Sequence, residues 1–287
     1  MDYSLREWIQ LAGQGSIAEA AVRRQAHSSG MTEAETRALM RHHLGCMQSA
    51  VREGLQEELR SNTGLTGGQA AMFMKRLREG KCLSGTLLGK AEVYALATAE
   101  CNAAMGVIVA APTAGACGIL PGAMLAMMED RNATEEQVID ALFTAAAVGQ
   151  SIASQASISG AEGGCQAECG SAAAMTAAAL VSIEGGTPRQ CADAAAFALM
   201  NLLGLVCDPV GGLVEVPCVY RNVGAVGVAF SAADMVLSGI VCPIEPDEVI
   251  QAMKEVGDAL PASLRETGEG GCAACQSIRA RLESMGL

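Results

Sequence analysis

Pairs of polar residues at one fixed spacing stand before several long stretches rich in Ala and Leu. In each pair a Ser or Thr is followed three residues later by Glu or Gln. The side chain of each residue can accept a hydrogen bond from the free backbone N–H of the other, which stabilises the first turn of a helix. The pairs are Ser4 with Glu7, Thr32 with Glu35, Thr134 with Gln137, and Thr187 with Gln190. Pro188 suits the first position of a helix, and Gly204 suits the left-handed backbone conformation that commonly follows the last turn. Together they predict a helix over 188–203.

Other stretches rich in Ala, Leu and Met lack sustained alternation and also predict helices. They are 33–59, 67–79, 84–105, 122–130, 135–156, 168–184, 222–238 and 246–256. Only the short run Val107 to Ala111 is β-like. The pattern predicts an all-α fold: a compact helical catalytic domain over 1–287, with an N-terminal helical segment of about 1–60 packed on a core of about 61–287.

Charge and composition narrow the class of protein. The formal net charge of -12 disfavours nucleic acid or an anionic membrane surface as a partner, because both attract clusters of Lys and Arg. The first ten residues lack the pattern of an export signal, so we expect a cytoplasmic protein. The charge-free stretch Cys101 to Met128 is interrupted by Pro112 and Pro121, which favours a buried core over a membrane span.

Five Gly-rich or Pro-containing loops separate the predicted helices and are where chemistry is expected. They are Ser61 to Gly68, Ala111 to Gly122, Ser159 to Gly170, Cys207 to Cys218 and Gly268 to Cys275. Of the twelve cysteines, three stand out by their context: Cys165 lies in GAEGGCQAEC, and Cys207 and Cys218 bracket CDPVGGLVEVPC. The predicted reducing compartment favours ligands over disulfides.

Three thiolates from these two loops could hold a [4Fe–4S] cluster and leave one iron without a protein ligand. Spacing alone leaves two alternatives open. One is that these cysteines are scattered core residues, and the other is zinc held by pairs such as Cys165 with Cys169 or Cys272 with Cys275.

Four ordered motifs resemble the iron–sulfur-dependent L-serine dehydratase family, specifically its separate α chain, over almost the whole length. They are SNTGLTGGQA at 61–70, APTAGACGILPG at 111–122, SGAEGGCQAECGSAAAM at 159–175 and CDPVGGLVEVPC at 207–218. The resemblance implies conversion of L-serine to pyruvate and ammonia. It also implies a [4Fe–4S] cluster on Cys165, Cys207 and Cys218, whose open iron binds the substrate.

The resemblance further implies a separate β subunit, since many family members carry a fused β domain that this chain lacks. A higher oligomer stays open. Many fused members end in a cysteine that occupies the fourth iron, whereas the last residue here is Leu287. Cys272, Cys275 and Cys169 are the candidates for a fourth ligand.

The substrate site is expected at the loops 61–68 and 112–116. Their backbone N–H groups and hydroxyls would hold the carboxylate of L-serine, whereas the alternative for loop 61–68 is a helix start capped by Thr66. The candidate substrate contacts are Ser61, Thr63, Gly64, Thr113 and Gly115.

The general base is not assigned from the sequence. His27, His42 and His43 lie away from the motifs, and Glu162 and Glu168, which flank Cys165, are the weak catalytic candidates. The partner chain or a cluster-bound group could also supply the base.

Three other functions compete with this interpretation. Pyridoxal phosphate is not expected, because its Schiff-base lysine would have to be Lys75, Lys81, Lys90 or Lys254, none of which lies on a cysteine-bearing loop. A related lyase for L-cysteine or L-threonine, and a non-enzymatic iron–sulfur or zinc sensor, stay open.

Overall fold

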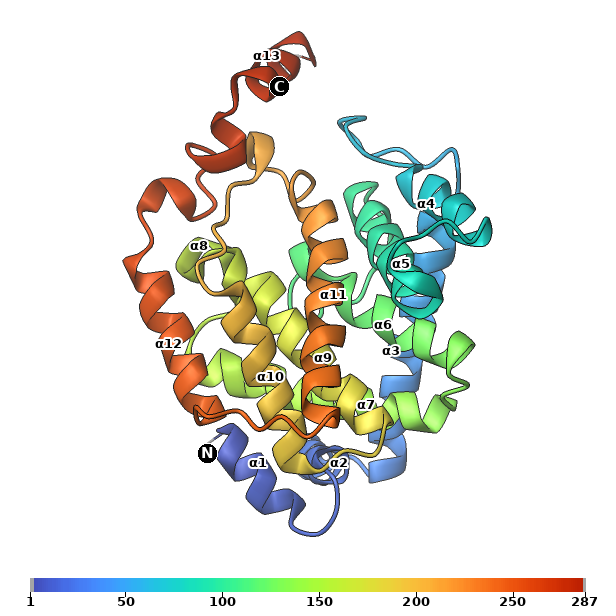
Figure 1. Cartoon of the computed structure of the whole chain (residues 1–287), viewed down its shortest axis with the longest axis vertical. Coiled ribbons are helices and arrows are strands. Elements are labelled where there is room, and N and C mark those ends of the chain that lie inside the picture. Colours follow the sequence, from blue (N-terminus) through green and yellow to red (C-terminus); the bar gives the residue numbers. More distant parts are fainter. Residues whose placement is uncertain (1–2, 286–287) are drawn as a thin grey trace.

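Helices form the framework of the molecule. The computed structural model describes residues 3–285, in which there are thirteen α-helices and no β-strand, so the predicted all-α fold is confirmed (Figure 1). The helices are α1 (Leu5–Ala12), α2 (Ile17–Ser29), α3 (Glu33–Gly54), α4 (Gln69–Arg78), α5 (Gly85–Ala103), α6 (Ile119–Asp130), α7 (Glu135–Gln155), α8 (Gly160–Gly163), α9 (Ser171–Ile183), α10 (Pro188–Leu202), α11 (Cys218–Leu237), α12 (Pro246–Ala259) and α13 (Gln276–Met285).

The predicted helix starts agree with the structure. Complete capping boxes precede α3, α7 and α10 at Thr32, Thr134 and Thr187, and the Ser4 hydroxyl accepts from the Glu7 N–H at the start of α1. Gly204 has a positive φ of 81°, as expected just beyond α10. Local side-chain chemistry therefore fixes these ends.

Some predicted elements were wrong or missed. The run Val107 to Ala111 forms no strand. The helix predicted over 33–59 already ends at Gly54, and the one predicted from residue 222 begins at Cys218. Helix α2 was missed, although Ser16 and Glu19 form a capping box before it. Helix α13 was also missed.

Small residues allow the helices to pack closely. Helix α9 packs against α7, α10 and α11, while α5 packs against α3, α6 and α11. A Cβ added at Gly54 of α3 would lie 1.9 Å from the backbone oxygen of Ala97, and one added at Gly122 of α6 would lie 2.6 Å from that of Ala91. Side chains at these crossings would force the helices apart.

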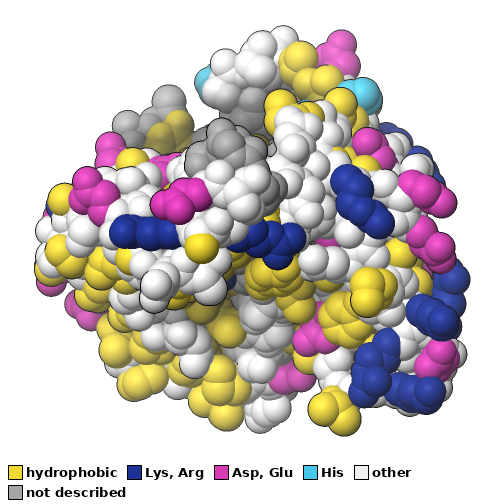
Figure 2. All heavy atoms as spheres, turned by 90° about the horizontal axis from the view of Figure 1, so that it is seen from above, with side chains coloured by type: hydrophobic (Ala, Val, Ile, Leu, Met, Phe, Trp, Pro, Cys, Tyr) yellow, Lys and Arg dark blue, Asp and Glu magenta, His cyan; other side chains and the backbone are white. Residues whose placement is uncertain are grey.

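The motif loops gather at one end of this framework. In Figure 1, α11 runs along the molecule with its Cys218 end at the top, whereas α1 and α2 lie at the opposite end. Figure 2 views the loop end, where hydrophobic side chains and both signs of charge share the surface. Within residues 3–285, no helix has the length and apolar character needed to cross a bilayer.

The crossing of α5 and α6 gives a test of the packing. Gly122→Ala should lower the free energy of unfolding by about 1–3 kcal/mol, because its Cβ has no room beside Ala91. Gly224→Ala on the exposed side of α11 is the matched control. No atom lies within 4 Å of its Cβ position, so stability should rise by up to about 1 kcal/mol. Urea unfolding followed by circular dichroism measures the free energy of unfolding of both variants. Equal changes in this free energy would show that the crossing of α5 and α6 has room for a Cβ.

Candidate active site

The three loop cysteines lie on three different segments that meet inside the molecule. Cys165 precedes a single π-helical turn, Gln166–Gly170, Cys207 lies in the loop after α10, and Cys218 is the first residue of α11. Their exposed fractions are 2%, 4% and 7%. Each lies close enough to the others for a charge on one to raise the pKa of the next.

The π-helical turn holds a fourth thiol next to the first. The sulfur of Cys169 lies 3.4 Å from that of Cys165, and Cys169 is fully buried. Hydrogen bonding between them lowers the pKa of Cys165 and raises that of Cys169. The nearby guanidinium of Arg221 also lowers the pKa of Cys165.

Glu168 connects this turn with two other motif loops. Its Oε1 accepts a hydrogen bond from the Thr113 hydroxyl at 2.7 Å, and its Oε2 lies 3.9 Å from the sulfur of Cys207. A Cβ added at Gly160 would lie 2.6 Å from Glu168 Oε2 and 2.9 Å from the sulfur of Cys207. Gly160 and Gly115 therefore leave the space that this carboxylate fills.

Burial dominates the electrostatics of the site. It raises the pKa of Cys218 to about 12 and also raises the pKa values of Cys207 and Glu168. Hydrogen bonding from Thr113 opposes the rise at Glu168. Without metal, the thiols of Cys207 and Cys218 thus keep their protons at neutral pH, and metal binding would release them.

Loop 61–68 is held by two buried carboxylates. Glu215, from the loop of Cys207 and Cys218, accepts from the Thr63 hydroxyl at 2.6 Å and from the N–H of Thr66 at 2.9 Å. Glu100 of α5 accepts from the backbone N–H groups of Gly67, Gln69 and Ala70 at 3.0–3.1 Å. These acids occupy donors that were expected to be available for a substrate carboxylate.

Ser61 and Gly64 form the turn at the start of the same loop. The Ser61 hydroxyl accepts from the N–H of Gly64 at 3.1 Å and lies 3.3 Å from the hydroxyl oxygen of Thr63. Gly64 has a φ of 70°, a left-handed conformation that favours glycine.

The loop that carries Thr113 and Gly115 is held by Asn222 of α11. Its amide donates to the carbonyls of Gly115 at 2.8 Å and Cys218 at 2.9 Å, and its oxygen accepts from the Gly118 N–H at 2.8 Å. Asn222 is fully buried. One side chain therefore joins a candidate substrate loop to a candidate cluster ligand.

The segment after α12 covers the loop of Cys207. The N–H of Cys207 donates to the Leu264 carbonyl at 2.9 Å, and the N–H of Glu266 donates to the Cys207 carbonyl at 2.8 Å. Asp208 pairs with Arg221 at 2.7 Å and accepts from the N–H of Cys272 at 2.6 Å. Cys272 and Cys275 are both exposed.

The two acidic candidates occupy different environments. Glu168 lies where the loops meet, whereas Glu162 is exposed, accepts from the Ser157 hydroxyl at 2.5 Å and lines a separate hollow with Lys254 and Arg265.

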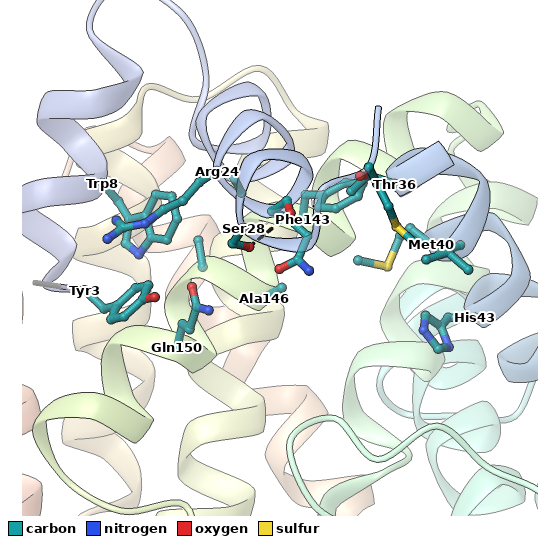
Figure 3. A pocket seen from close by; sticks show the side chains of 15 residues that line it. Tyr3, Trp8, Arg24, Ser28, Thr36, Met40, His43, Phe143, Ala146 and Gln150 are labelled. Atoms are coloured by element: carbon teal, nitrogen blue, oxygen red, sulfur yellow. Dashed lines mark hydrogen bonds between the residues drawn. The ribbon is translucent and has the colours of Figure 1, made fainter. Parts of the chain in front are cut away.

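The three histidines are exposed and lie on α2 and α3. Figure 3 shows His43 at a cavity of about 250 Å³ between α2, α3 and α7, which none of the motif residues lines.

Among residues 3–285, no three His, Cys, Asp or Glu side chains are placed to bind a single metal ion together. The ligands of a cluster bind different iron atoms and can stand further apart. Buried thiols from three segments of the chain and a guanidinium beside Cys165 fit an anionic iron–sulfur group.

Sequence reasoning missed the residues that hold the loops together: Glu100, Asp208, Glu215, Arg221 and Asn222. Asp208 and Glu215 lie within a recognised motif, so a search for acids between its two cysteines could have found them. Glu100 offered one signal, since it is the single charged residue within 93–105.

Fold and loops together define an all-α protein with a buried thiol site suited to an iron–sulfur cluster. The family model described as "Serine dehydratase alpha chain" matches residues 13–273, and the chain therefore belongs to this family. It is 50% identical over 278 residues to the "Probable L-serine dehydratase, alpha chain" of Bacillus subtilis (strain 168), covering 96% of this chain and 92% of that one.

Two further relatives show how the match is distributed. The "L-serine dehydratase, alpha chain" of Peptoniphilus asaccharolyticus is 40% identical over 270 residues, covering 93% of this chain and 92% of the relative. The "L-serine dehydratase" of Streptomyces coelicolor (strain ATCC BAA-471 / A3(2) / M145) is 37% identical over 270 residues, covering 93% of this chain and 59% of the relative. That longer relative extends well beyond the shared part.

The burial of the site predicts the order in which its thiols react. In the cluster-free chain, iodoacetamide should label the exposed Cys272 and Cys275 first and Cys165, Cys207 and Cys218 far more slowly. Mass spectrometry of peptides taken over time measures each rate, and labelling in urea supplies the fully accessible reference. Equal rates in the folded chain would show that the site is not closed.

Proposed function

We propose that this chain is the catalytic α chain of an L-serine dehydratase, a lyase that converts L-serine to pyruvate and ammonia. The observation that carries the proposal is the meeting of Cys165, Cys207 and Cys218 in one buried site with Glu168 and Thr113. Family membership and the names of the relatives support the reaction and its substrate.

The proposed cofactor is a [4Fe–4S] cluster on Cys165, Cys207 and Cys218. When bound, it supplies a Lewis-acidic iron with an open position, which makes the substrate hydroxyl a better leaving group. Arg221 would offset part of the negative charge at Cys165. For the remaining ligand position, Cys169, Cys272 and Cys275 stay candidates, and Cys169 is the one that lies beside Cys165.

The proposed substrate walls are the turns at Ser61 to Gly64 and Thr113 to Gly115. The hydroxyl of Thr63 donates a hydrogen bond to Glu215, and that of Thr113 donates one to Glu168. These two hydroxyls therefore shape the walls and do not donate to a substrate carboxylate. The Ser61 hydroxyl and loop N–H groups are then the candidate donors to that carboxylate. Glu168 is the acid placed to hold a proton at this site, whereas Glu162 is exposed.

A separate β chain is the proposed partner. The family model and the relatives of Bacillus subtilis and Peptoniphilus asaccharolyticus are named as α chains, which supports a second, separate chain. We further propose a cytoplasmic protein that acts as one catalytic domain, with about 1–60 packed on about 61–287.

The cysteine assignment is tested by substitution. Anaerobically purified chain, assayed with its β partner, should contain about four irons and four sulfides and form pyruvate from L-serine. Cys165→Ala, Cys207→Ala or Cys218→Ala should each abolish the cluster and the activity. Cys191→Ala, in the buried face of α10 away from the loops, should keep both. Full activity in all three loop variants would refute the assignment.

Substrate choice is tested with L-serine, L-cysteine and L-threonine side by side. We expect the highest kcat/KM for L-serine, as the relatives' names suggest. Faster turnover of either other amino acid would identify a related lyase. A cluster bound by four protein thiolates, with no spectral change on adding L-serine, would instead identify a sensor.

A further inference from the structure

One buried carboxylate joins two of the motif loops. Glu215 lies three residues before Cys218, and only 4% of its surface is exposed. Its Oε2 accepts from the Thr63 hydroxyl at 2.6 Å, and its Oε1 accepts from the N–H and the hydroxyl of Thr66 at 2.9 and 2.7 Å. These three donors stabilise a buried charge that would otherwise be costly.

The receiving loop has no helix or strand to fix its shape. The N–H of Ser61 donates to the Thr66 carbonyl at 3.1 Å, which closes a turn over the residues between them. Glu100 holds only the later part, from Gly67 to Ala70. The first part, which carries the proposed substrate contacts, is therefore held toward the cysteine loop by Glu215.

The backbone of Glu215 is in turn fixed to the first turn of α11. Its carbonyl accepts from the N–H of Val219 at 2.9 Å, directly after Cys218. Within the same loop, the N–H of Val210 donates to the Val216 carbonyl at 2.8 Å. A movement of the Cys218 end of α11 would therefore move the carboxylate that holds loop 61–68.

We infer that Glu215 is a positioning residue, which sets loop 61–68 at a fixed place relative to Cys218. This inference rests on the proposed function, because it takes the loop as a substrate wall and Cys218 as a cluster ligand. Glu215 acts through Thr63 and Thr66 and does not contact the reacting atoms. Its effect should therefore fall on substrate binding more than on cluster binding.

Kinetics of the cluster-loaded enzyme with its β partner test this role. Glu215→Ala should raise the KM for L-serine about tenfold or more, with kcat changed less than about threefold and iron content unchanged. Glu215→Gln keeps one acceptor oxygen for Thr66, so it should recover part of the loss. Glu184→Gln, an exposed acid paired with Arg131, is the matched control and should behave as wild type.

A double variant separates this contact from general damage. Thr66→Val removes the hydroxyl that Glu215 accepts from, so it should raise KM in the same direction. Glu215→Ala with Thr66→Val should be little worse than Glu215→Ala alone, because both remove the same contact. Additive effects, an unchanged KM, or loss of iron from Glu215→Gln would each overturn the inference.

Hydrogen–deuterium exchange of the cluster-free chain supplies a readout independent of activity. Amides of residues 61–66 should exchange faster in Glu215→Ala than in wild type, while those of α9 should not change. Unchanged exchange over 61–66 would overturn the inference even in an active enzyme. If wild type forms no pyruvate with cluster and partner, the proposed function fails, and exchange still decides whether Glu215 holds the loop.

Discussion

Hydrogen bonds from loop backbone to buried side-chain oxygens are the interaction on which the candidate site depends. The motif loops have little regular structure of their own, yet their backbone enters the protein interior, where an unpaired N–H is costly. Glu100, Glu215 and Asn222 supply the acceptors for these groups. Each comes from a different part of the chain than the loop it holds, so the loops are fixed relative to one another as well as internally.

The helical framework makes these contacts possible by bringing distant segments close together. Gly54 and Gly122 let α3 and α6 approach the backbone of α5, and α9 has an almost unbroken run of buried Ala. Such packing leaves little freedom for α5 and α11 to shift. The positions of Glu100 and Asn222 are thus set by helix packing, and the loops take their shape from side chains that are already rigid.

Sequence reasoning succeeded where the signal was local and failed where it was not. Capping pairs located the starts of α3, α7 and α10, and glycine and proline context singled out three cysteines that the structure brings together. Glu100 acts 30–33 residues away and Glu215 149–152 residues away, so no spacing rule relates them to loop 61–68. Thr63 and Thr113 resembled free donors because the acids that accept from them were not visible as partners.

The same burial that shapes the site also determines the protonation of its groups. Glu162 is exposed, whereas Glu168 is partly buried, and this burial raises its pKa despite the hydrogen bond from Thr113. The thiols of Cys207 and Cys218 lose water for the same reason. A metal group bound there would replace the protons of the thiols. Proton content and metal content of this site are therefore linked, and Glu168 lies between Thr113 and Cys207 where both meet.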